Sequence, residues 1–227
     1  PDKHFRKYAH NSPVDGYGMV LIFHFSTFSQ AMPCLMALPF AKRIAYIHNI
    51  TPIEHTKGLN KKQIDTLRHG FKQLTMLKDF DAHIYNSIST QNELKEQIGN
   101  FSGTRMTIMP ISAGRYLDYA AKTPAKKTSR QIISIGRLVP NKNVERLIEI
   151  LAEIARRDPK VRLIYVGQSV DPAYTEHLFS QVRQYGLEFN FLHLQLVRED
   201  LLFRLIAKSN LLISVSKHEG FCVPILE

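Results

Sequence analysis

Two glutamates eight positions apart, Glu219 and Glu227, bracket the segment of this chain with the clearest chemistry. They enclose a Gly-Phe pair and a proline, and the apolar run 211–215 precedes them. This order predicts a strand, a tight loop and the opening of a helix. Glycine allows backbone N–H groups to approach a phosphate, and a helix N-terminus adds partial positive charge. Because the carboxylates can accept hydrogen bonds from hydroxyls, the segment predicts a site for phosphate and hydroxyl groups.

The second half of the chain alternates strands and helices around this segment. Strands are expected at 132–135, 162–167, 189–194 and 211–215, and helices at about 143–157 and within 174–185 and 198–209. In the first of these helices, apolar side chains recur at spacings of three and four, which indicates one buried face: Val144, Leu147, Ile148, Leu151 and Ala155. Repeated strand and helix units of this length predict a parallel sheet covered on both faces.

The first half shows the same alternation less clearly. Strands are expected at 19–25, 44–47, 83–85 and 106–109, and a helix at about 91–98. The fold class predicted for the whole chain is α/β, with two doubly wound, Rossmann-like domains that face a cleft. Ligands of such folds bind at the carboxyl ends of the strands.

The domain boundary is expected at the polar, charged and proline-bearing segment 121–130. A partial N-terminal domain would then span 1–120, and a partial C-terminal domain 131–227. Both are expected to be incomplete, because the chain begins at Pro1 without a methionine and stops at Glu227, within the expected first turn of a helix.

The net charge of +10 is unevenly distributed. Residues 1–120 carry 14 basic and 9 acidic side chains, 121–130 carry 4 and 0, and 131–227 carry 12 and 11. Such a diffuse excess is typical of a solvated basic surface, and it also fits contact with an anionic membrane. Nucleic acid binding is the least favoured explanation, and no nucleic acid partner is predicted.

Location and redox state follow from what the sequence lacks. No run reaches the roughly 18 apolar residues of a transmembrane helix, and the start has no signal-peptide pattern. We therefore expect a cytoplasmic protein, with peripheral contact at the inner face of the membrane as an extension. The two cysteines, Cys34 and Cys222, match neither a disulfide framework nor a zinc pattern and are expected to be free thiols.

Histidines and acidic pairs outside the C-terminal segment provide further candidates. His48 ends an apolar strand and precedes Asn49, so its side chain is expected at the mouth of the cleft. His24 occupies a comparable place one strand earlier, but a lone histidine among aromatic residues is more often a core residue; His24 and Asn49 are therefore secondary candidates. The pair Asp79 and Asp81 is interpreted as a helix end and a turn. Because no pattern such as HExxH occurs, no metal site is predicted.

Taken together, these segments resemble a known enzyme family. Residues 134–138, Lys142, 165–167 and 219–227 look like the C-terminal nucleotide-sugar domain of the retaining GT-B glycosyltransferases of family 4. In the first half, 46–52 and 86–87 resemble the acceptor domain of its bacterial mannosyl- and rhamnosyltransferase-like members. The chain departs from the family at 191–195, where a glycine is often found, and it lacks the glycine-rich loop of the first strand-to-helix turn.

The resemblance implies a role for each candidate. Arg137 and Lys142 would bind the donor diphosphate, and Glu219 the donor sugar, with His48 at the same sugar. Glu227 would bind the ribose hydroxyls. The backbone near Gly220, Phe221 and Cys222 would face the donor.

The implied activity is transfer of a hexose, with retention of anomeric configuration, from a nucleotide-sugar to a glycan or lipid-linked acceptor. GDP-mannose is the donor that the resemblance favours. The nucleotide-sugar is a substrate, so no cofactor is expected, and the enzyme would be metal-independent. Three alternatives stay open: a non-hydrolysing sugar-nucleotide epimerase, a basic nucleic-acid-binding module and an inactive fragment.

Overall fold

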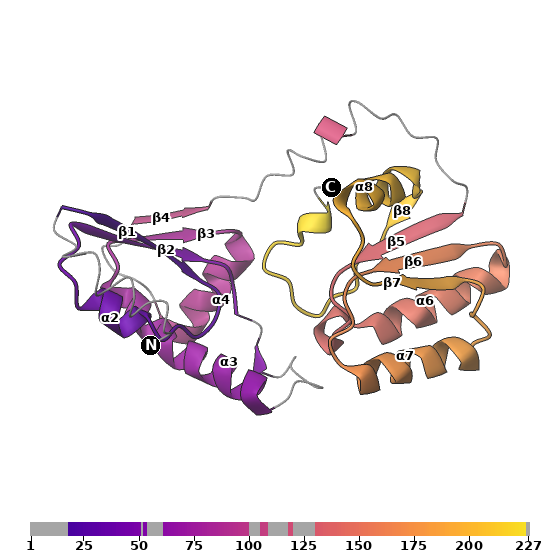
Figure 1. Ribbon diagram of the computed structural model, residues 1–227, viewed down its shortest axis with the longest axis horizontal. Coiled ribbons are helices and arrows are strands. Elements are labelled where there is room, and N and C mark those ends of the chain that lie inside the picture. The colour runs from indigo at the N-terminus through magenta and orange to yellow at the C-terminus, as the bar shows by residue number, and fades with distance from the viewer. Residues whose placement is uncertain are drawn as a thin grey trace. The chain divides into compact units, whose positions relative to one another are not determined.

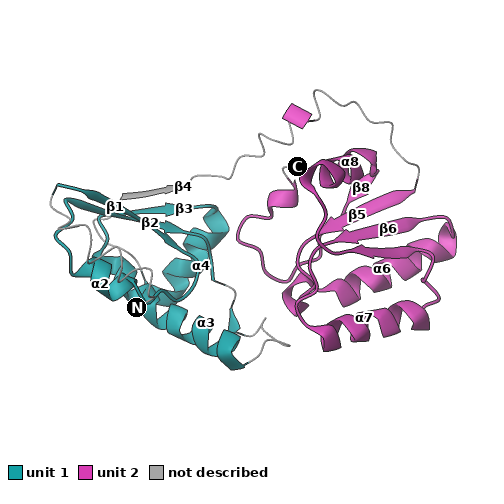
Figure 2. Ribbon diagram, viewed as in Figure 1, with its two compact units in different colours: residues 1–53, 60–111 teal, residues 54–59, 112–227 magenta. Residues whose placement is uncertain are grey.

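The computed structural model describes residues 18–50, 52–53, 61–99, 105–108, 118–119 and 130–225. The chain divides into two compact units (Figure 2). Described residues up to Ile108 belong to the first unit, and those from Asp118 onward to the second. The predicted linker, 121–130, lies outside the described residues except for Arg130.

The first unit is built on a parallel sheet with strand order β1-β2-β3-β4 (Figure 1). Its strands are β1 (Val20–Phe25), β2 (Lys42–Ile47), β3 (Ala82–Tyr85) and β4 (Arg105–Ile108). Its helices are α2 (Met32–Met36), α3 (Lys61–Gln73), the 3-10 helix η2 (Leu74–Asp79) and α4 (Ile88–Ile98). The Ser87 hydroxyl caps α4 by accepting a hydrogen bond from the Thr90 N–H at 3.1 Å.

Alternation along β1 decides which side chains enter the core of this unit. Phe25 is fully buried, and Phe23 packs against the same core, whereas the side chains at Ile22 and His24 are exposed on the other face. The core is completed from β2, β3, η2 and α4 by large apolar side chains: Ile47, Tyr85, Leu74, Leu77 and Leu94.

The second unit has a parallel sheet with strand order β7-β6-β5-β8. Its strands are β5 (Gln131–Ile135), β6 (Arg162–Val166), β7 (Phe191–Leu194) and β8 (Leu211–Leu212). Its helices are α6 (Val144–Arg157), α7 (Pro172–Gln184) and α8 (Glu199–Lys208), with short 3-10 turns at η3 (Pro140–Lys142) and η4 (Val223–Ile225).

Helices cover both faces of this second sheet. Figure 1 shows α6 and α7 on one face and α8 on the other. Two separate clusters of apolar side chains match these faces, one around Leu147 and Leu163 and one around Ile133 and Phe203. The doubly wound arrangement predicted from the sequence is therefore confirmed for this unit.

The order of the strands creates a switch point beside β5. The chain runs from β5 to β6 and β7 on one side, and then returns to place β8 on the other side. The loops after β5 and β8 therefore both begin at the carboxyl edge of the sheet, on adjacent strands. Ligands of open α/β sheets bind at such points.

Some elements differ from the sequence predictions. The strand expected at 211–215 forms ladder pairs only at Leu211–Leu212. The strand expected from Phe189 begins at Phe191, because the Asn190 amide donates hydrogen bonds to two carbonyls before β6 and holds a turn there. The short helix α2 has no counterpart in the predictions. In the part of the chain that the structure describes, no helix is both long and apolar enough to cross a bilayer.

Candidate functional site

The loops after β5 and β6 in the second unit meet through their backbones. A Cβ atom on Gly167 would lie 1.7 Å from the Gly136 carbonyl oxygen and 3.2 Å from the Arg137 nitrogen. The two loops continue the sheet beyond the strand ends, since the Gly136 N–H donates to the Val166 carbonyl at 2.9 Å and the Gly167 N–H to the Leu194 carbonyl at 2.8 Å. The backbone of Gly136 and Gly167, which carries no side chain, therefore lies at the switch point, and we call it the glycine floor.

The loop after β8 is bound to the loop after β5 by two hydrogen bonds. The Lys217 N–H donates to the Asn141 carbonyl at 2.8 Å. The Asn143 side chain donates from Nδ2 to the Val215 carbonyl at 3.2 Å. Asn143 has left-handed backbone angles, which turns the chain from η3 into α6. These contacts fix the two loops against each other across the switch point.

An ion pair joins the same two loops. Lys142 Nζ lies 2.5 Å from Glu219 Oε1, and the side chains are 20% and 28% exposed. The stem of Lys142 passes over the glycine floor, because a Cβ on Gly136 would lie 3.1 Å from Lys142 Cε. Below the pair, Tyr165 donates its hydroxyl hydrogen to the Arg137 carbonyl at 3.1 Å. Burial raises the pKa of Tyr165, and the charge of Glu219 raises it further.

Sequence reasoning placed Lys142 and Glu219 at one site, and the structure brings them into direct contact. Arg137 is exposed on the loop after β5, and its guanidinium makes no ion pair with a described residue. Gly220 and Phe221 follow Glu219 and are half-buried. Glu227 lies outside the described residues.

Cys222 has a backbone conformation that is unusual for a residue with a side chain. Its φ is 59°, in the left-handed region, and its carbonyl accepts a hydrogen bond from the Ile225 N–H at 3.0 Å. This turn is η4, a single 3-10 turn, where the sequence predicted the opening of a helix. Both cysteines are free thiols, as expected.

Other polar groups at this edge have no role assigned by sequence reasoning. His193 on β7 has Nε2 2.8 Å from the Gly167 carbonyl oxygen. Tyr174 on α7 donates to Glu145 Oε2 at 2.7 Å, and burial together with this bond raises the pKa of Tyr174. Their positions in the sequence could have indicated them: Tyr174 lies in α7, the helix that follows Gly167, and His193 lies in β7, the strand that follows this helix.

In the first unit, His24 and His48 lie side by side at the carboxyl end of the sheet. His24 Nδ1 is 2.9 Å from His48 Nε2, and both rings stack on Tyr46, with centroid distances of 5.0 and 4.6 Å. The interpretation of His24 as a core residue is wrong: it is exposed, because Phe23 and Phe25 occupy the core face of β1. Burial lowers the pKa of His48, and the charge of His24 lowers it further.

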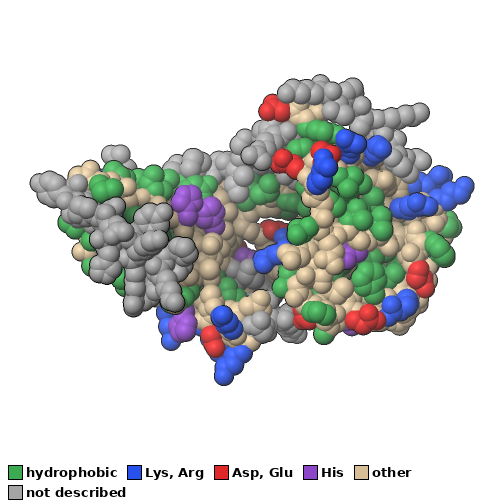
Figure 3. Space-filling model, in the orientation of Figure 1, with side chains coloured by type: hydrophobic (Ala, Val, Ile, Leu, Met, Phe, Trp, Pro, Cys, Tyr) green, Lys and Arg blue, Asp and Glu red, His purple; other side chains and the backbone are tan. Residues whose placement is uncertain are grey.

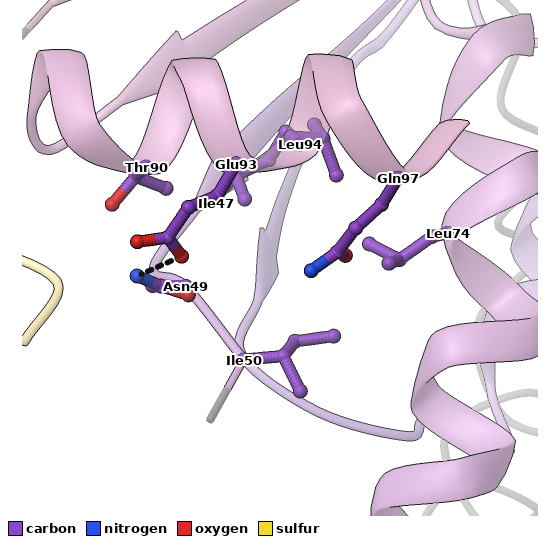
Figure 4. A pocket seen from close by; sticks show the side chains of 8 residues that line it. All are labelled: Ile47, Asn49, Ile50, Leu74, Thr90, Glu93, Leu94 and Gln97. Carbon is purple, nitrogen blue, oxygen red and sulfur yellow. Dashed lines mark hydrogen bonds between the residues drawn. The ribbon is translucent and has the colours of Figure 1, made fainter. Parts of the chain in front are cut away.

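Asn49 follows His48 and lines a small hollow between β2 and α4 (Figure 4). Its φ is 76°, and its amide donates to Glu93 Oε2 at 3.1 Å. Gln97 and Thr90 add polar groups, and the apolar floor is formed by Ile47, Ile50, Leu74 and Leu94. The hollow has room for about one water molecule.

The acidic pair before β3 forms a turn, as the sequence predicted. η2 ends at Asp79, and Asp81 accepts a hydrogen bond from the Arg43 N–H at 2.7 Å. Lys42 Nζ lies 3.9 Å from the Asp81 carboxylate. Within the described ranges, no three His, Cys, Asp or Glu side chains come together as a metal site would require.

Comparison with known proteins gives an independent result for the second unit. The family model described as Glycosyl transferases group 1 matches residues 117–227. This stretch contains both loops of the switch point. No curated protein matches the chain.

Solved structures match across both units. Sucrose-phosphate synthase from Thermosynechococcus elongatus has a TM-score of 0.71 at 16% identity, covering 97% of this chain and 55% of its own. The Anabaena protein HepE, in complex with UDP and glucose, has a TM-score of 0.59 at 21% identity, with 81% and 49% covered. Trehalose-6-phosphate synthase OtsA has a TM-score of 0.63 at 13% identity, with 88% and 52% covered.

This chain spans about half the length of these three structures. Identities this low show the fold, and the match extends over most of the chain. The chain therefore has the fold of the GT-B glycosyltransferases, and residues 117–227 match their group 1 family model.

Proposed function

We propose that this protein is a glycosyltransferase that uses a nucleotide-sugar donor bound at the switch point of the second unit. The observation that carries the proposal is the Lys142–Glu219 pair, held over the bare backbone of Gly136 and Gly167. A cation and a carboxylate side by side offer one group for a diphosphate and one for sugar hydroxyls. The match of residues 117–227 to the group 1 model supports the same activity.

The leaving group explains the need for positive charge. As the bond to the sugar breaks, negative charge grows on the diphosphate while the sugar carbon becomes cationic. Lys142 and Arg137 would stabilise that negative charge, and loss of one such contact commonly costs about 3 kcal/mol, or about a hundredfold in rate. The two glycines let the loops after β5 and β6 pack closely beneath the stem of Lys142, which would hold its ammonium at the proposed diphosphate site.

The remaining roles follow the order of the loop after β8. Glu219 would accept hydrogen bonds from the donor sugar, and backbone groups near Gly220, Phe221 and Cys222 would line the donor. Glu227 would bind the ribose hydroxyls. These assignments rest on the family motif and on the position of Glu219 beside Lys142.

The family motif also assigns roles to residues of the first unit. His48 would contact the donor sugar, with Asn49 and His24 beside it as secondary candidates. The position of His48 directly after β2, at the carboxyl end of a parallel sheet, supports this role. The proposed division into an acceptor-side domain, 1–120, and a donor domain, 131–227, follows from the same assignment.

The finer proposal is a retaining, metal-independent hexosyltransferase of family 4, similar to mannosyl- and rhamnosyltransferases. No protein nucleophile is assigned, and the leaving phosphate would help to deprotonate the acceptor. The acceptor would be a glycan or a lipid-linked glycan. A cytoplasmic enzyme in peripheral contact with an anionic membrane would fit the basic excess of residues 1–130.

Calorimetry with four nucleotides tests the donor site. GDP, UDP, dTDP and ADP are titrated into the chain, with UDP first because HepE was solved with UDP. We expect saturable binding of one nucleotide, lost in an Arg137→Ala/Lys142→Ala double variant. Arg146→Ala is the matched control, because Arg146 is an exposed arginine of α6 paired with Glu149. Failure of all four nucleotides to bind a cooperatively folded chain would contradict the proposal.

Of the three open alternatives, no observation favours the nucleic-acid-binding module or the epimerase. Nucleic acid binding needs a continuous basic face, whereas Figure 3 shows acidic and basic side chains interspersed on the visible face of the second unit. An epimerase would change the nucleotide-sugar without any acceptor. Incubation of the donor with and without an added acceptor separates that reaction from transfer.

A further inference from the structure

The bond between His24 and His48 uses one nitrogen of each ring and leaves one nitrogen of each ring outside it. The bonded atoms are Nδ1 of His24 and Nε2 of His48, at 2.9 Å. A neutral imidazole has one donor and one acceptor nitrogen. A neutral pair therefore has two arrangements, and in each of them one outer nitrogen carries a proton and the other does not.

The sheet and a neighbouring aromatic ring hold this pair in place. His24 is in register with Tyr46 on β2, and the His48 N–H donates to the Phe25 carbonyl at 2.8 Å, which continues the ladder past the strand end. Tyr46 is only 8% exposed and stacks on both imidazoles. The pair is therefore held by the pairing of β1 with β2 and by the ring of Tyr46.

The two rings differ in their access to water. His24 is exposed and His48 is half-buried, so His24 is the residue of the pair with the greater access to solvent. Burial lowers the pKa of His48 and the charge of His24 lowers it further, which disfavours a state with two imidazolium rings.

Other titratable groups at this edge of the unit have different partners. Tyr46 contributes its ring to the stack, and Glu93 of α4 accepts a hydrogen bond from Asn49. Tyr85, at the end of β3, belongs to the core on the opposite side of the sheet. Among these groups, the hydrogen-bond partner of each imidazole is therefore the other imidazole.

We propose that His24 and His48 form a two-ring proton relay between the half-buried end of the pair and solvent. A proton that arrives at Nδ1 of His48 is matched by transfer of the Nε2 proton of His48 to Nδ1 of His24. The Nε2 proton of His24 then leaves to water. One proton enters and one leaves, only N–H bonds change, and the pair is left in the other of its two neutral arrangements. His24 acts through His48, as a positioning and relay residue.

The use of the relay rests on the proposed function. Glycosyl transfer removes the hydroxyl proton of the acceptor as the new glycosidic bond forms, and that proton must reach solvent. A His48 that contacts the donor sugar would lie near this proton. The leaving phosphate would help to take this proton from the acceptor, and the relay would then give it a route to water.

NMR of the chain with 15N-labelled histidine tests the pair without any ligand. We expect the nitrogen signals of His24 and His48 to change together over one pH interval, as one shared proton is taken up. In a His24→Ala variant, His48 should titrate alone with a higher pKa, because the charge of His24 is gone. Identical His48 titrations in the wild type and the variant would overturn the pair.

A transferase assay tests the relay itself. Asparagine places an amide near the Nδ1 position, so His24→Asn keeps a hydrogen bond to His48 but cannot pass a proton. We expect both His24→Asn and His24→Ala to lower kcat about tenfold or more with little change in KM, and added imidazole to restore kcat in His24→Ala. Exposed His177 provides the control, His177→Ala. Full activity of His24→Asn would refute the relay and leave a positioning role.

The two tests also separate this inference from the proposed function. Coupled titration in a chain that binds no nucleotide would contradict the donor site and leave the pair intact. Nucleotide binding in a chain whose two histidines titrate independently would support the donor site and contradict the histidine pair.

Discussion

Replacing Glu219 by glutamine removes one charge of the Lys142–Glu219 pair and preserves its shape. Two unit charges 2.5 Å apart attract each other by about 7 kcal/mol at an effective dielectric constant of 20. Loss of hydration offsets most of this attraction, because the side chains are only 20% and 28% exposed. We take about 1 to 2 kcal/mol as the net coupling that a bound phosphate must overcome.

This coupling predicts opposite effects on two ligands. In Glu219→Gln the ammonium of Lys142 is no longer neutralised, so the nucleoside diphosphate alone should bind about tenfold more tightly, equivalent to ~1.4 kcal/mol. The complete nucleotide-sugar should gain less or lose affinity, because the carboxylate proposed to accept hydrogen bonds from the sugar hydroxyls is gone. Lys142→Ala should weaken both ligands by tenfold to a hundredfold.

Calorimetry with matched ligands measures both effects. The nucleoside diphosphate that binds the wild type is compared with its sugar derivative in wild type, Glu219→Gln and Lys142→Ala. Glu149→Gln serves as the control, because it breaks an exposed ion pair with Arg146 outside the site. Equal weakening of both ligands by Glu219→Gln, or no change in either, would refute the reasoning.

Three further predictions concern stability. Gly167→Ala should lower the unfolding free energy by several kcal/mol in urea titrations, because the new Cβ would overlap the Gly136 carbonyl; unchanged stability would contradict the close approach. Asp171→Ala should cost about 1 kcal/mol, because the Asp171 carboxylate caps α7 through two backbone N–H groups, and thermal unfolding would register a lower midpoint. The pKa values of His48 and His83 are lowered in the folded state, mainly by burial, so the unfolded chain binds more protons and stability should fall as the pH drops below about 6.5; a thermal midpoint that does not fall from pH 7.5 to pH 5.5 would count against this.

The sequence predicts the strands of the second unit well and their contacts poorly. The strand at 132–135 and the helix that begins at Val144 are read from apolar spacing, which depends on local residues alone. The close approach of Gly136 and Gly167 depends on the register of β5 against β6, which no local pattern specifies. For the same reason, the contact of Lys142 with Glu219 appears only in the structure.

His24 shows a second limit of sequence reasoning. Its aromatic neighbours suggested burial, although alternation along β1 places Phe23 and Phe25 on the face opposite to His24. The contact with His48 follows from strand order, because β1 and β2 are adjacent and parallel. Residue type alone was therefore misleading, and strand periodicity would have been the better guide.

The ion pair of the switch point joins residues 77 positions apart in the chain. The pairing of β8 with β5 is strongly non-local, because β6, β7 and three α-helices lie between the two strands in the chain. A nascent chain that ends at β7 would hold the glycine floor and Lys142 but lack the opposing carboxylate. The proposed recognition of a nucleotide-sugar through this pair would thus be an indicator of late assembly, and a ligand that bridges both loops would slow their separation during unfolding.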